Sequence, residues 1–219
     1  MQPEDQVSLD CVADAAELAG DRDWWGIYED AFPPAEREPR DVVLRSLRAS
    51  IGLAVRARQG GATVGIATTH LLLRPPAVFL VYLAIDREQR NAGLGGRLLE
   101  YAWQTSARRL EQRSLAPLGL IWEVDDPAAA VDSEETLLRE RRIGFFQRHG
   151  GVELDRPYRQ PPVNGPEILP MRLLFRANGS PSVPDAEIVE SLVHAIYFEK
   201  YAAVNQVPDE LLQALFLVS

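Results

Sequence analysis

Residues 81–99 read VYLAIDREQRNAGLGGRLL, and this stretch says more about the fold than any other part of the chain. It begins inside an apolar run over residues 78–85, which stops at a charged turn. Glycines then gather between residues 93 and 96, and leucines recur at helical spacing from Leu94 onward. The stretch therefore predicts a strand, a glycine-rich turn and the start of a helix.

The predicted turn has the chemistry of an anion site. The first N–H groups of a helix have no partner within the helix, and the helix dipole is positive at that end. Glycine has no Cβ, so a phosphate can approach the backbone closely. Arg90 adds a charged fork of N–H donors beside the turn. We therefore expect a phosphate-bearing ligand at this place.

The spacing of the glycines distinguishes between phosphate ligands. A dinucleotide site needs a third glycine where Leu98 stands, which leaves an NAD(P)-dependent oxidoreductase as the weakest alternative. A P-loop needs Gly-Lys-Ser/Thr, which is absent from the stretch. The order present is R-x-x-G-x-G over residues 90–95, preceded by Leu-Ala-Ile over residues 83–85. It resembles the acetyl-CoA pyrophosphate loop of the GCN5-related N-acetyltransferase (GNAT) superfamily.

The resemblance implies a site for acetyl-CoA as cosubstrate. In that superfamily the loop binds the pyrophosphate, and the backbone at the end of the preceding strand pairs with the pantetheine arm. The residues expected to contact the cofactor are Leu83, Ala84, Ile85, Arg90, Asn91, Ala92, Gly93, Leu94, Gly95, Gly96 and Phe146.

Composition restricts the other classes. The chain has 219 residues and a net charge of −9, which argues against nucleic-acid binding because phosphate contacts need clustered Lys and Arg. Cys11 is the single cysteine, so no disulfide can form within the chain. No apolar stretch is long enough to span a membrane, and the N-terminus does not resemble a signal peptide. We expect a cytoplasmic protein.

The predicted elements follow the GNAT order from residue 7 to residue 176: strand, two helices, three strands, helix, strand, helix and two strands. We therefore expect an α/β fold of the GNAT type, with a mixed, mostly antiparallel, splayed sheet flanked by helices. The predicted elements span residues 7–12, 21–32, 39–50, 53–58, 63–73, 78–85, 94–113, 118–124, 132–149, 152–154 and 171–176.

A base for the amine is expected at the end of the fifth strand. Residues 120–124 read LIWEV and resemble the "L-E-V" of the N-terminal acetyltransferases of ribosomal proteins, where the glutamate is the base. Glu123 is therefore the predicted catalytic residue, acting through water, with a pKa raised by partial burial. The alternative is a structural ion pair with a nearby arginine at position 139, 141 or 142.

The resemblance fails at one position. The superfamily often carries F-Y-x-x-x-G, whose tyrosine protonates the leaving thiolate, and Phe146 occupies that place here. Because a thiol with a pKa of about 8.5 leaves readily, water is one substitute. Tyr158 and Tyr82 are the other candidates for the acid, and Phe146 is expected to line the pantetheine channel and the core.

Two further motifs resemble a subset of bacterial acetyltransferase-like proteins. One is F-P-x-x-E-R over residues 32–37, and the other is Y-x-Q-P over residues 158–161. On the acceptor side of the GNAT fold, Glu36 suits a cationic substrate and Arg37 an anionic one, and Tyr158 is a third candidate substrate contact. The alternative for both motifs is a fixed turn with a local ion pair.

The last part of the chain is additional to the superfamily core. A domain over residues 1–177 is expected to precede a linker and helical extension over residues 178–219. Apolar residues at helical spacing, from Ile188 to Tyr197, predict a helix that packs back on the domain or, alternatively, forms a dimer contact or a lid. His70, His149 and His194 have no metal-ligand spacing, so no metal is expected.

Taken with the motifs, these features predict transfer of an acyl group from acetyl-CoA to a primary amine of a small molecule or peptide, by direct attack. The amine substrate is unidentified at this stage, and a homodimer is a possible assembly. The alternative is a non-catalytic acyl-CoA-binding regulatory module, which the phenylalanine at position 146 keeps open.

Overall fold

The computed structural model describes residues 6–90, 93–179 and 182–218. They form two compact units. The first takes residues up to Leu71 together with Leu80–Ala116, and the second takes Leu72–Phe79 together with the residues from Pro117 onward. The units therefore divide the chain elsewhere than at the boundary expected after residue 177, which stays a prediction.

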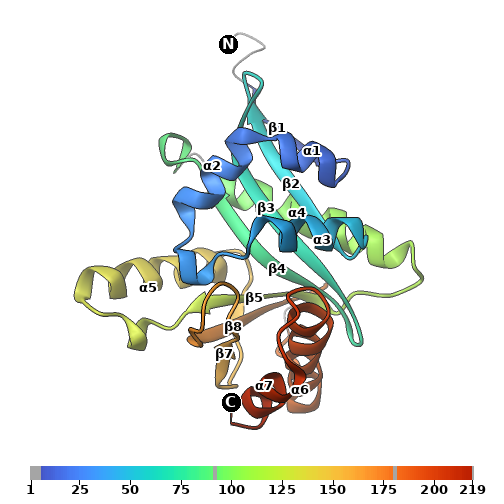
Figure 1. Ribbon diagram of the computed structural model, residues 1–219, viewed down its shortest axis with the longest axis vertical. Helices are drawn as coiled ribbons and strands as arrows, with labels where there is room; N and C mark the ends of the chain where they lie inside the picture. Colours follow the sequence, from blue (N-terminus) through green and yellow to red (C-terminus); the bar gives the residue numbers. More distant parts are fainter. Residues whose placement is uncertain (1–5, 91–92, 180–181, 219) are drawn as a thin grey trace. The chain divides into compact units, whose positions relative to one another are not determined.

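The first unit contains the elements up to the long fourth helix (Figure 1), except that the end of the third strand and the start of the fourth belong to the second unit. Its strands follow one another in the order β1-β2-β3-β4, and β1–β2 and β2–β3 are antiparallel. The elements are β1 (Ser8–Cys11), α1 (Ala15–Gly20), α2 (Arg22–Ala31), a 3₁₀ turn (Pro34–Glu36), α3 (Arg40–Arg48), β2 (Gly52–Gln59), β3 (Ala62–Leu73), β4 (Pro76–Ile85), a second 3₁₀ turn (Arg87–Gln89) and α4 (Leu94–Glu111).

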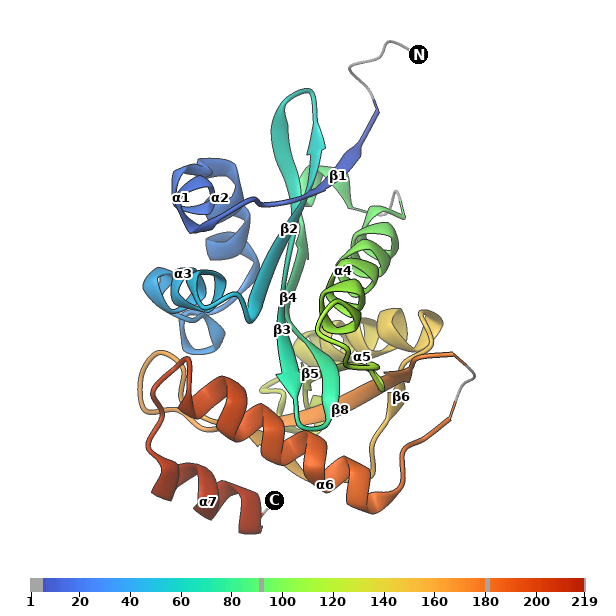
Figure 2. The same ribbon diagram turned by 90° about the vertical axis from the view of Figure 1, so that its right-hand side faces the viewer.

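Helices cover both faces of this sheet. Figure 2 shows α1, α2 and α3 on one face and α4 on the other. The core under α2 is aromatic, since Trp24, Trp25 and Tyr28 are buried and pack edge-on or stacked against one another. The turn of F-P-x-x-E-R, which is exposed at Pro33 and Pro34 and half-buried elsewhere, leads from this core into α3. Two covered faces explain why β2 and β3 are almost continuously buried.

The second unit is built around β5 and β8. These strands pair antiparallel over their whole length, and β6 and β7 both pair with β8. The elements are β5 (Gly119–Asp125), a 3₁₀ turn (Pro127–Ala129), α5 (Ser133–Arg148), β6 (Val152–Glu153), β7 (Tyr158–Gln160), β8 (Leu169–Ala177), α6 (Ala186–Ala195), a π-helix (Ile196–Ala202) and α7 (Asp209–Val218).

The C-terminal segment packs within the second unit. Leu192, Val193 and Ile196 are fully buried, and so is Tyr197. This packing corresponds to the first alternative expected for the segment, a helix that packs back on the domain. Helical spacing predicted α6 correctly, but the apolar stripe continues into a π-helix, whose wider turn is rare and frequently found at functional sites.

The observed elements confirm the predicted mixed α/β fold and add two short ones. Helix α1 has six residues and starts at Asp14, whose side chain accepts the N–H groups of Ala16 and Glu17. Strand β7 has three residues and lies in the stretch expected to be an irregular, Pro-rich connection. Both are too short to carry a periodic apolar pattern, so neither was predicted.

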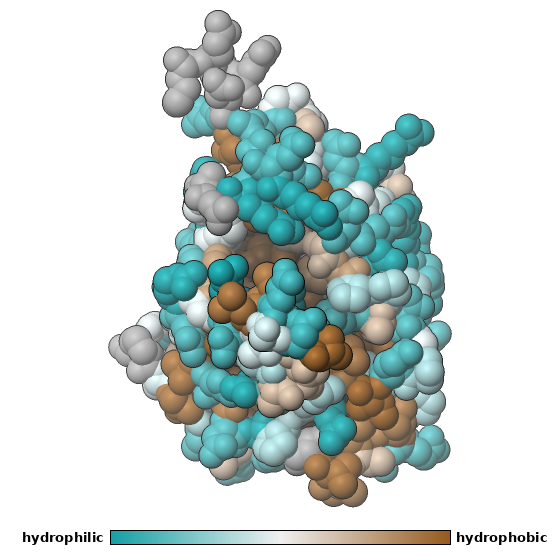
Figure 3. Space-filling view, turned by 90° about the vertical axis from the view of Figure 1, so that its left-hand side faces the viewer, coloured by the Kyte–Doolittle hydropathy of each residue, from teal (hydrophilic) through white to brown (hydrophobic). Residues whose placement is uncertain are grey.

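Exposed apolar side chains are dispersed over the surface. On the face drawn in Figure 3, hydrophobic patches are interrupted by hydrophilic side chains. The most exposed large apolar residues are Val131 before α5 and Leu217 and Val218 at the end of α7. Among the described helices, none has the length and hydrophobicity that a membrane span requires.

Candidate active site

The glycine loop, residues 90–96, joins the end of β4 to α4 through a left-handed residue. Gly93 has φ +73° and ψ 3°, and a Cβ placed there would meet no described atom within 4 Å. Arg90 is exposed, and its Nε donates to the carbonyl oxygen of Ile85 at 3.2 Å. Asn91 and Ala92, which belong to the predicted cofactor site, lie outside the described residues. A glycine is favoured at position 93 because L-residues rarely adopt positive φ.

The start of α4 is open to an external anion. Gly93 has no side chain to cap the helix, and the first turn contains no acidic residue. By contrast, the other α-helices of the described chain each carry an acidic residue in the first turn. Leu94 is buried, whereas Gly95 and Gly96 are half-buried. The first turn of this 18-residue helix therefore presents the positive end of the helix dipole without an acidic side chain of its own.

The strand that precedes the glycine loop alternates between buried and half-buried residues. Ala84 is 8% exposed, while Leu83 and Ile85 on either side are half-buried. This strand end and the glycine loop both belong to the first unit. The unit thus brings together the described residues that were expected to hold acetyl-CoA, with the exception of Phe146.

In the second unit, one carboxylate gathers three polar side chains. Tyr201 Oη donates to Glu123 Oε1 at 2.9 Å and to Oε2 at 2.8 Å. Gln160 Nε2 donates to Oε2 at 2.8 Å, and Tyr158 Oη donates to Oε1. We call these four residues the Glu123 cluster. It unites β5, β7 and the π-helix around a half-buried glutamate.

The environment of Glu123 acts on its pKa in two directions. Burial raises the pKa of the carboxyl above its ordinary value of 4.5. Hydrogen bonds from Tyr158, Tyr201 and Gln160 and the nearby Lys200 ammonium lower it, but burial outweighs them. Burial and the charge of Glu123 also raise the pKa of the Tyr158 phenol well above 10. A glutamate with a raised pKa is suited to exchange protons.

Two of the three arginines proposed as structural partners of Glu123 bind other groups. Arg142 pairs with Asp125, and Arg139 pairs with Glu135 at 2.7 Å and donates to the carbonyl oxygen of Asp126. The known hydrogen bonds of Glu123 come from two phenols and an amide, all neutral donors.

Phe146 lies on the other face of β5. Its ring packs against Trp122, with 4.9 Å between the ring centroids, and only 7% of the residue is exposed. Trp122 and Glu123 are consecutive in a strand, so their side chains point to opposite faces. The residue in the place of the superfamily's tyrosine therefore belongs to the core under α5 and does not contact the Glu123 carboxylate.

The F-P-x-x-E-R motif forms a braced turn in the first unit. The Tyr82 hydroxyl donates to the carbonyl oxygen of Glu36 and accepts the N–H of Glu38, at 2.9 and 2.8 Å. The Arg37 guanidinium donates to the carbonyl oxygen of Glu29 at 2.8 Å. Tyr82 is thus engaged in holding the turn, which does not support it as the general acid. The substrate contacts predicted for Glu36 and Arg37 stay predictions.

Two members of the Glu123 cluster, Gln160 and Tyr201, were not predicted from the sequence. Gln160 follows Tyr158 at the strand period of two, so Y-x-Q places both side chains on one face, and this signal was available. The side-chain amide oxygen of Gln160, Oε1, is buried without a hydrogen-bond partner among the described residues, which is unusual in folded proteins. Tyr201 lies 78 residues from Glu123, and no local pattern indicated it.

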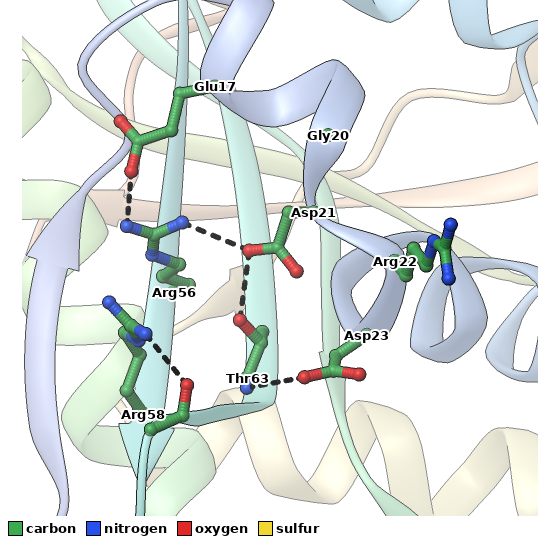
Figure 4. A pocket seen from close by; sticks show the side chains of 9 residues that line it. Glu17, Gly20, Asp21, Arg22, Asp23, Arg56, Arg58 and Thr63 are labelled. Atoms are coloured by element: carbon green, nitrogen blue, oxygen red, sulfur yellow. Dashed lines mark hydrogen bonds and ion pairs between the residues drawn. The ribbon is translucent and has the colours of Figure 1, made fainter.

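A surface pocket of about 400 Å³ lies between α1, α2 and the β2–β3 hairpin (Figure 4), and none of the predicted site residues lines it. Its central residue is Arg56, which is 7% exposed and forms ion pairs with Asp10, Glu17 and Asp21. Thr63 Oγ1 also donates to Asp21. These contacts tie β1, α1 and α2 to β2, so we assign Arg56 to the structure of the first unit.

Within the described part of the chain, no group of His, Cys, Asp and Glu side chains could hold a metal ion. His149 binds the carbonyl oxygen of Phe145 at 2.8 Å at the end of α5. Burial raises the pKa of the Cys11 thiol, which does not favour a nucleophile there.

The comparison with protein families agrees with the glycine loop. Residues 22–117 match the model described as the Acetyltransferase (GNAT) family. The match agrees with the family that the loop resembles, over a segment that is somewhat less than half of the chain. The matched segment includes the glycine loop but ends before Glu123. No curated protein matches the chain by sequence.

Solved structures share the fold at low sequence identity. A Bacteroides thetaiotaomicron protein described as a GNAT-family acetyltransferase is 22% identical, with a TM-score of 0.67 over 92% of this chain and 99% of its own. The Salmonella typhimurium protein yncA, solved with acetyl-CoA, is 16% identical, with a TM-score of 0.54 over 83% and 99%.

A plant enzyme gives a similar result. Arabidopsis thaliana NAA60 in complex with acetyl-CoA is 12% identical, with a TM-score of 0.57 over 80% of this chain and 100% of its own. At these identities the likeness establishes the α/β GNAT fold.

Proposed function

We propose that this chain, which matches the GNAT acetyltransferase family over residues 22–117, transfers an acetyl group from acetyl-CoA to a primary amine of a small molecule or peptide. The observation that carries the proposal is the start of α4. Its left-handed Gly93, lack of a side-chain cap and lack of acidic residues suit a bound pyrophosphate. Solved proteins of the same fold bind acetyl-CoA, which supports the choice of cofactor.

In the proposed reaction the amine attacks the thioester carbonyl directly. A bond forms between nitrogen and the carbonyl carbon, the carbon–sulfur bond breaks, and CoA leaves as the thiolate. The amine loses a proton, which Glu123 receives through a water molecule. Glu123 must be ionised for this step, so the rate should fall as the pH drops through its raised pKa.

The Glu123 cluster supports this role for Glu123. Its donors, Tyr158, Tyr201 and Gln160, are uncharged, so burial keeps the pKa of the carboxyl raised, and a raised pKa suits a group that takes up and releases a proton. An arginine partner would instead favour the ionised form strongly. Because Phe146 is buried against Trp122, we propose that water protonates the thiolate.

A second candidate is a non-catalytic acyl-CoA-binding module. It is favoured by one observation, the three side chains that already donate hydrogen bonds to the Glu123 carboxylate. A carboxylate engaged in this way has fewer lone pairs for an incoming proton. The two candidates differ in whether CoA is released in the presence of an amine.

The test is a two-step assay on the full chain. Acetyl-CoA and CoA should raise the melting temperature, and NAD(P) should not. Release of CoA thiol from acetyl-CoA, followed colorimetrically, should then require one of a library of primary amines. Stabilisation without amine-dependent thiol release across the library would favour the binding module, and no stabilisation by any CoA species would refute both candidates. The cytoplasmic location and the homodimer stay predictions.

A further inference from the structure

We propose that Tyr201, in the C-terminal segment, is a positioning residue that sets the orientation and proton affinity of the Glu123 carboxylate. The consequence for the reaction rests on the proposed function, in which Glu123 takes the amine proton. Tyr201 lies outside the segment that matches the GNAT family model, so the family match assigns no role to it. The C-terminal segment then becomes part of the reactive site.

The position of the Tyr201 hydroxyl orients the Glu123 carboxylate. Its hydroxyl lies 2.9 Å from one oxygen of Glu123 and 2.8 Å from the other, so it bridges both. Tyr158 and Gln160 each contact one oxygen. Tyr201 therefore restricts rotation of the carboxylate about its last bond, together with Tyr158 and Gln160. The residue is 1% exposed, so water does not compete for this contact.

The π-helix that carries Tyr201 is anchored on two sides. The Tyr197 hydroxyl donates to the carbonyl oxygen of Arg159 at 2.8 Å. The Glu199 carboxylate accepts the N–H groups of Leu73 and Arg74, at 2.6 and 3.0 Å, at the turn between β3 and β4. These contacts leave Tyr201 little freedom to turn away from Glu123. Such a held donor is what an oriented proton acceptor requires.

A buried cation of the same π-helix acts on Glu123 in the same sense. Lys200 is 1% exposed, and its Nζ donates to Asn205 Oδ1 at 2.8 Å. Its charge favours the ionised form of Glu123, as does the hydrogen bond from Tyr201. Two consecutive residues of the C-terminal segment thus oppose the effect of burial on the same carboxylate.

The experiment compares Tyr201→Phe with Tyr197→Phe. Both variants remove one hydroxyl from a buried tyrosine of the same π-helix, but only the first removes a hydrogen bond to Glu123. Two quantities are measured: the pKa of Glu123, from the carboxyl carbon signal in ¹³C NMR, and the pH dependence of kcat/KM with the best amine found. Glu123→Gln serves to assign the NMR signal.

The expected result is a higher Glu123 pKa in Tyr201→Phe. A hydrogen bond to a charged group favours the ionised carboxylate, and its loss should raise the pKa by about one unit or more. The acidic limb of the rate should move to higher pH by the same amount, so the rate below that limb falls about tenfold. Tyr197→Phe should shift the pKa and the acidic limb far less, because it leaves the hydrogen bonds to Glu123 in place and the Glu199 contacts still anchor the π-helix.

Two outcomes separate this proposal from the proposed function. An unchanged Glu123 pKa in folded Tyr201→Phe would overturn the proposal. A raised pKa with an unmoved acidic limb would support the control of Glu123 by Tyr201 and refute Glu123 as the base. Should Tyr201→Phe not fold, Lys200→Met tests the same segment, because removal of the ammonium should raise the Glu123 pKa and an unchanged value would count against the proposal.

Discussion

The glycine loop and the Glu123 cluster are built in opposite ways. The loop takes seven consecutive residues that run into the first turn of α4, and its proposed function depends on backbone N–H groups and one left-handed glycine. The cluster joins side chains from β5, β7 and the π-helix, with 78 residues between Glu123 and Tyr201. The glycine loop is therefore defined by its local sequence, whereas the Glu123 cluster forms only when the second unit is folded.

This difference suggests a division of labour. A pyrophosphate needs little more than an open helix start, which a short motif can supply. A proton acceptor needs a tuned and oriented carboxylate, and burial with several donors can supply both. We therefore expect variants of the loop to affect binding of acetyl-CoA, and variants of the cluster to affect turnover.

The largest effect is expected for Glu123→Gln. Loss of a positioned base typically costs about 10²–10⁴-fold in rate, and the amide keeps the shape of the side chain. The variant should lower kcat by that order, flatten the acidic limb of the pH profile and leave acetyl-CoA affinity nearly unchanged. Steady-state kinetics with the best amine and calorimetric titration check these values. Turnover at the wild-type level would leave Glu123 with a structural role.

The sequence predicted most of the fold because its signals are local. Strands β2, β3 and β4 and helices α3, α4 and α5 follow from apolar periodicity and from Gly and Pro at their ends. The connection between β5 and the C-terminal segment was harder to predict. There the three residues of β7 lie among prolines, and pairing with β8 rather than intrinsic pattern makes them a strand.

The candidate site could be predicted only in part for the same reason. Glu123 was found through a motif at a strand end, and Tyr158 through Y-x-Q-P. That Tyr158, Gln160 and Tyr201 donate to one carboxylate is a tertiary fact, which a single sequence does not contain. The burial of Phe146 under α5, away from that carboxylate, is likewise a result of packing.

A smaller effect, on stability, is expected from the C-terminal segment. Leu192 is fully buried in α6, so Leu192→Ala should lower the free energy of unfolding by about 2–5 kcal/mol. Leu217 in α7 is 82% exposed, and Leu217→Ala should change it by less than about 0.5 kcal/mol. Urea denaturation compares the two. Equally small changes would mean that the segment is a passive appendage, contrary to its contact with Glu123.

The smallest effect is expected for Phe146→Tyr. The added hydroxyl would be buried beside Trp122, at a cost of about 1–3 kcal/mol in the free energy of unfolding if it finds no partner. Turnover should stay unchanged or rise modestly, because position 146 does not face the Glu123 carboxylate. Thermal melting and kcat at one pH suffice as measurements. A large gain in kcat would show that this position reaches the leaving thiolate after all.

The most direct test of the central claim, that the glycine loop binds acetyl-CoA, is calorimetric titration of acetyl-CoA into Gly93→Asp and Gly93→Asn. Both side chains tolerate a left-handed backbone and would meet no described atom within 4 Å of their Cβ, so the pair differs chiefly in charge. We expect Gly93→Asp to stay folded and to lose binding, because its carboxylate repels the pyrophosphate. Gly93→Asn should retain clearly more affinity. Wild-type affinity in folded Gly93→Asp would contradict the claim.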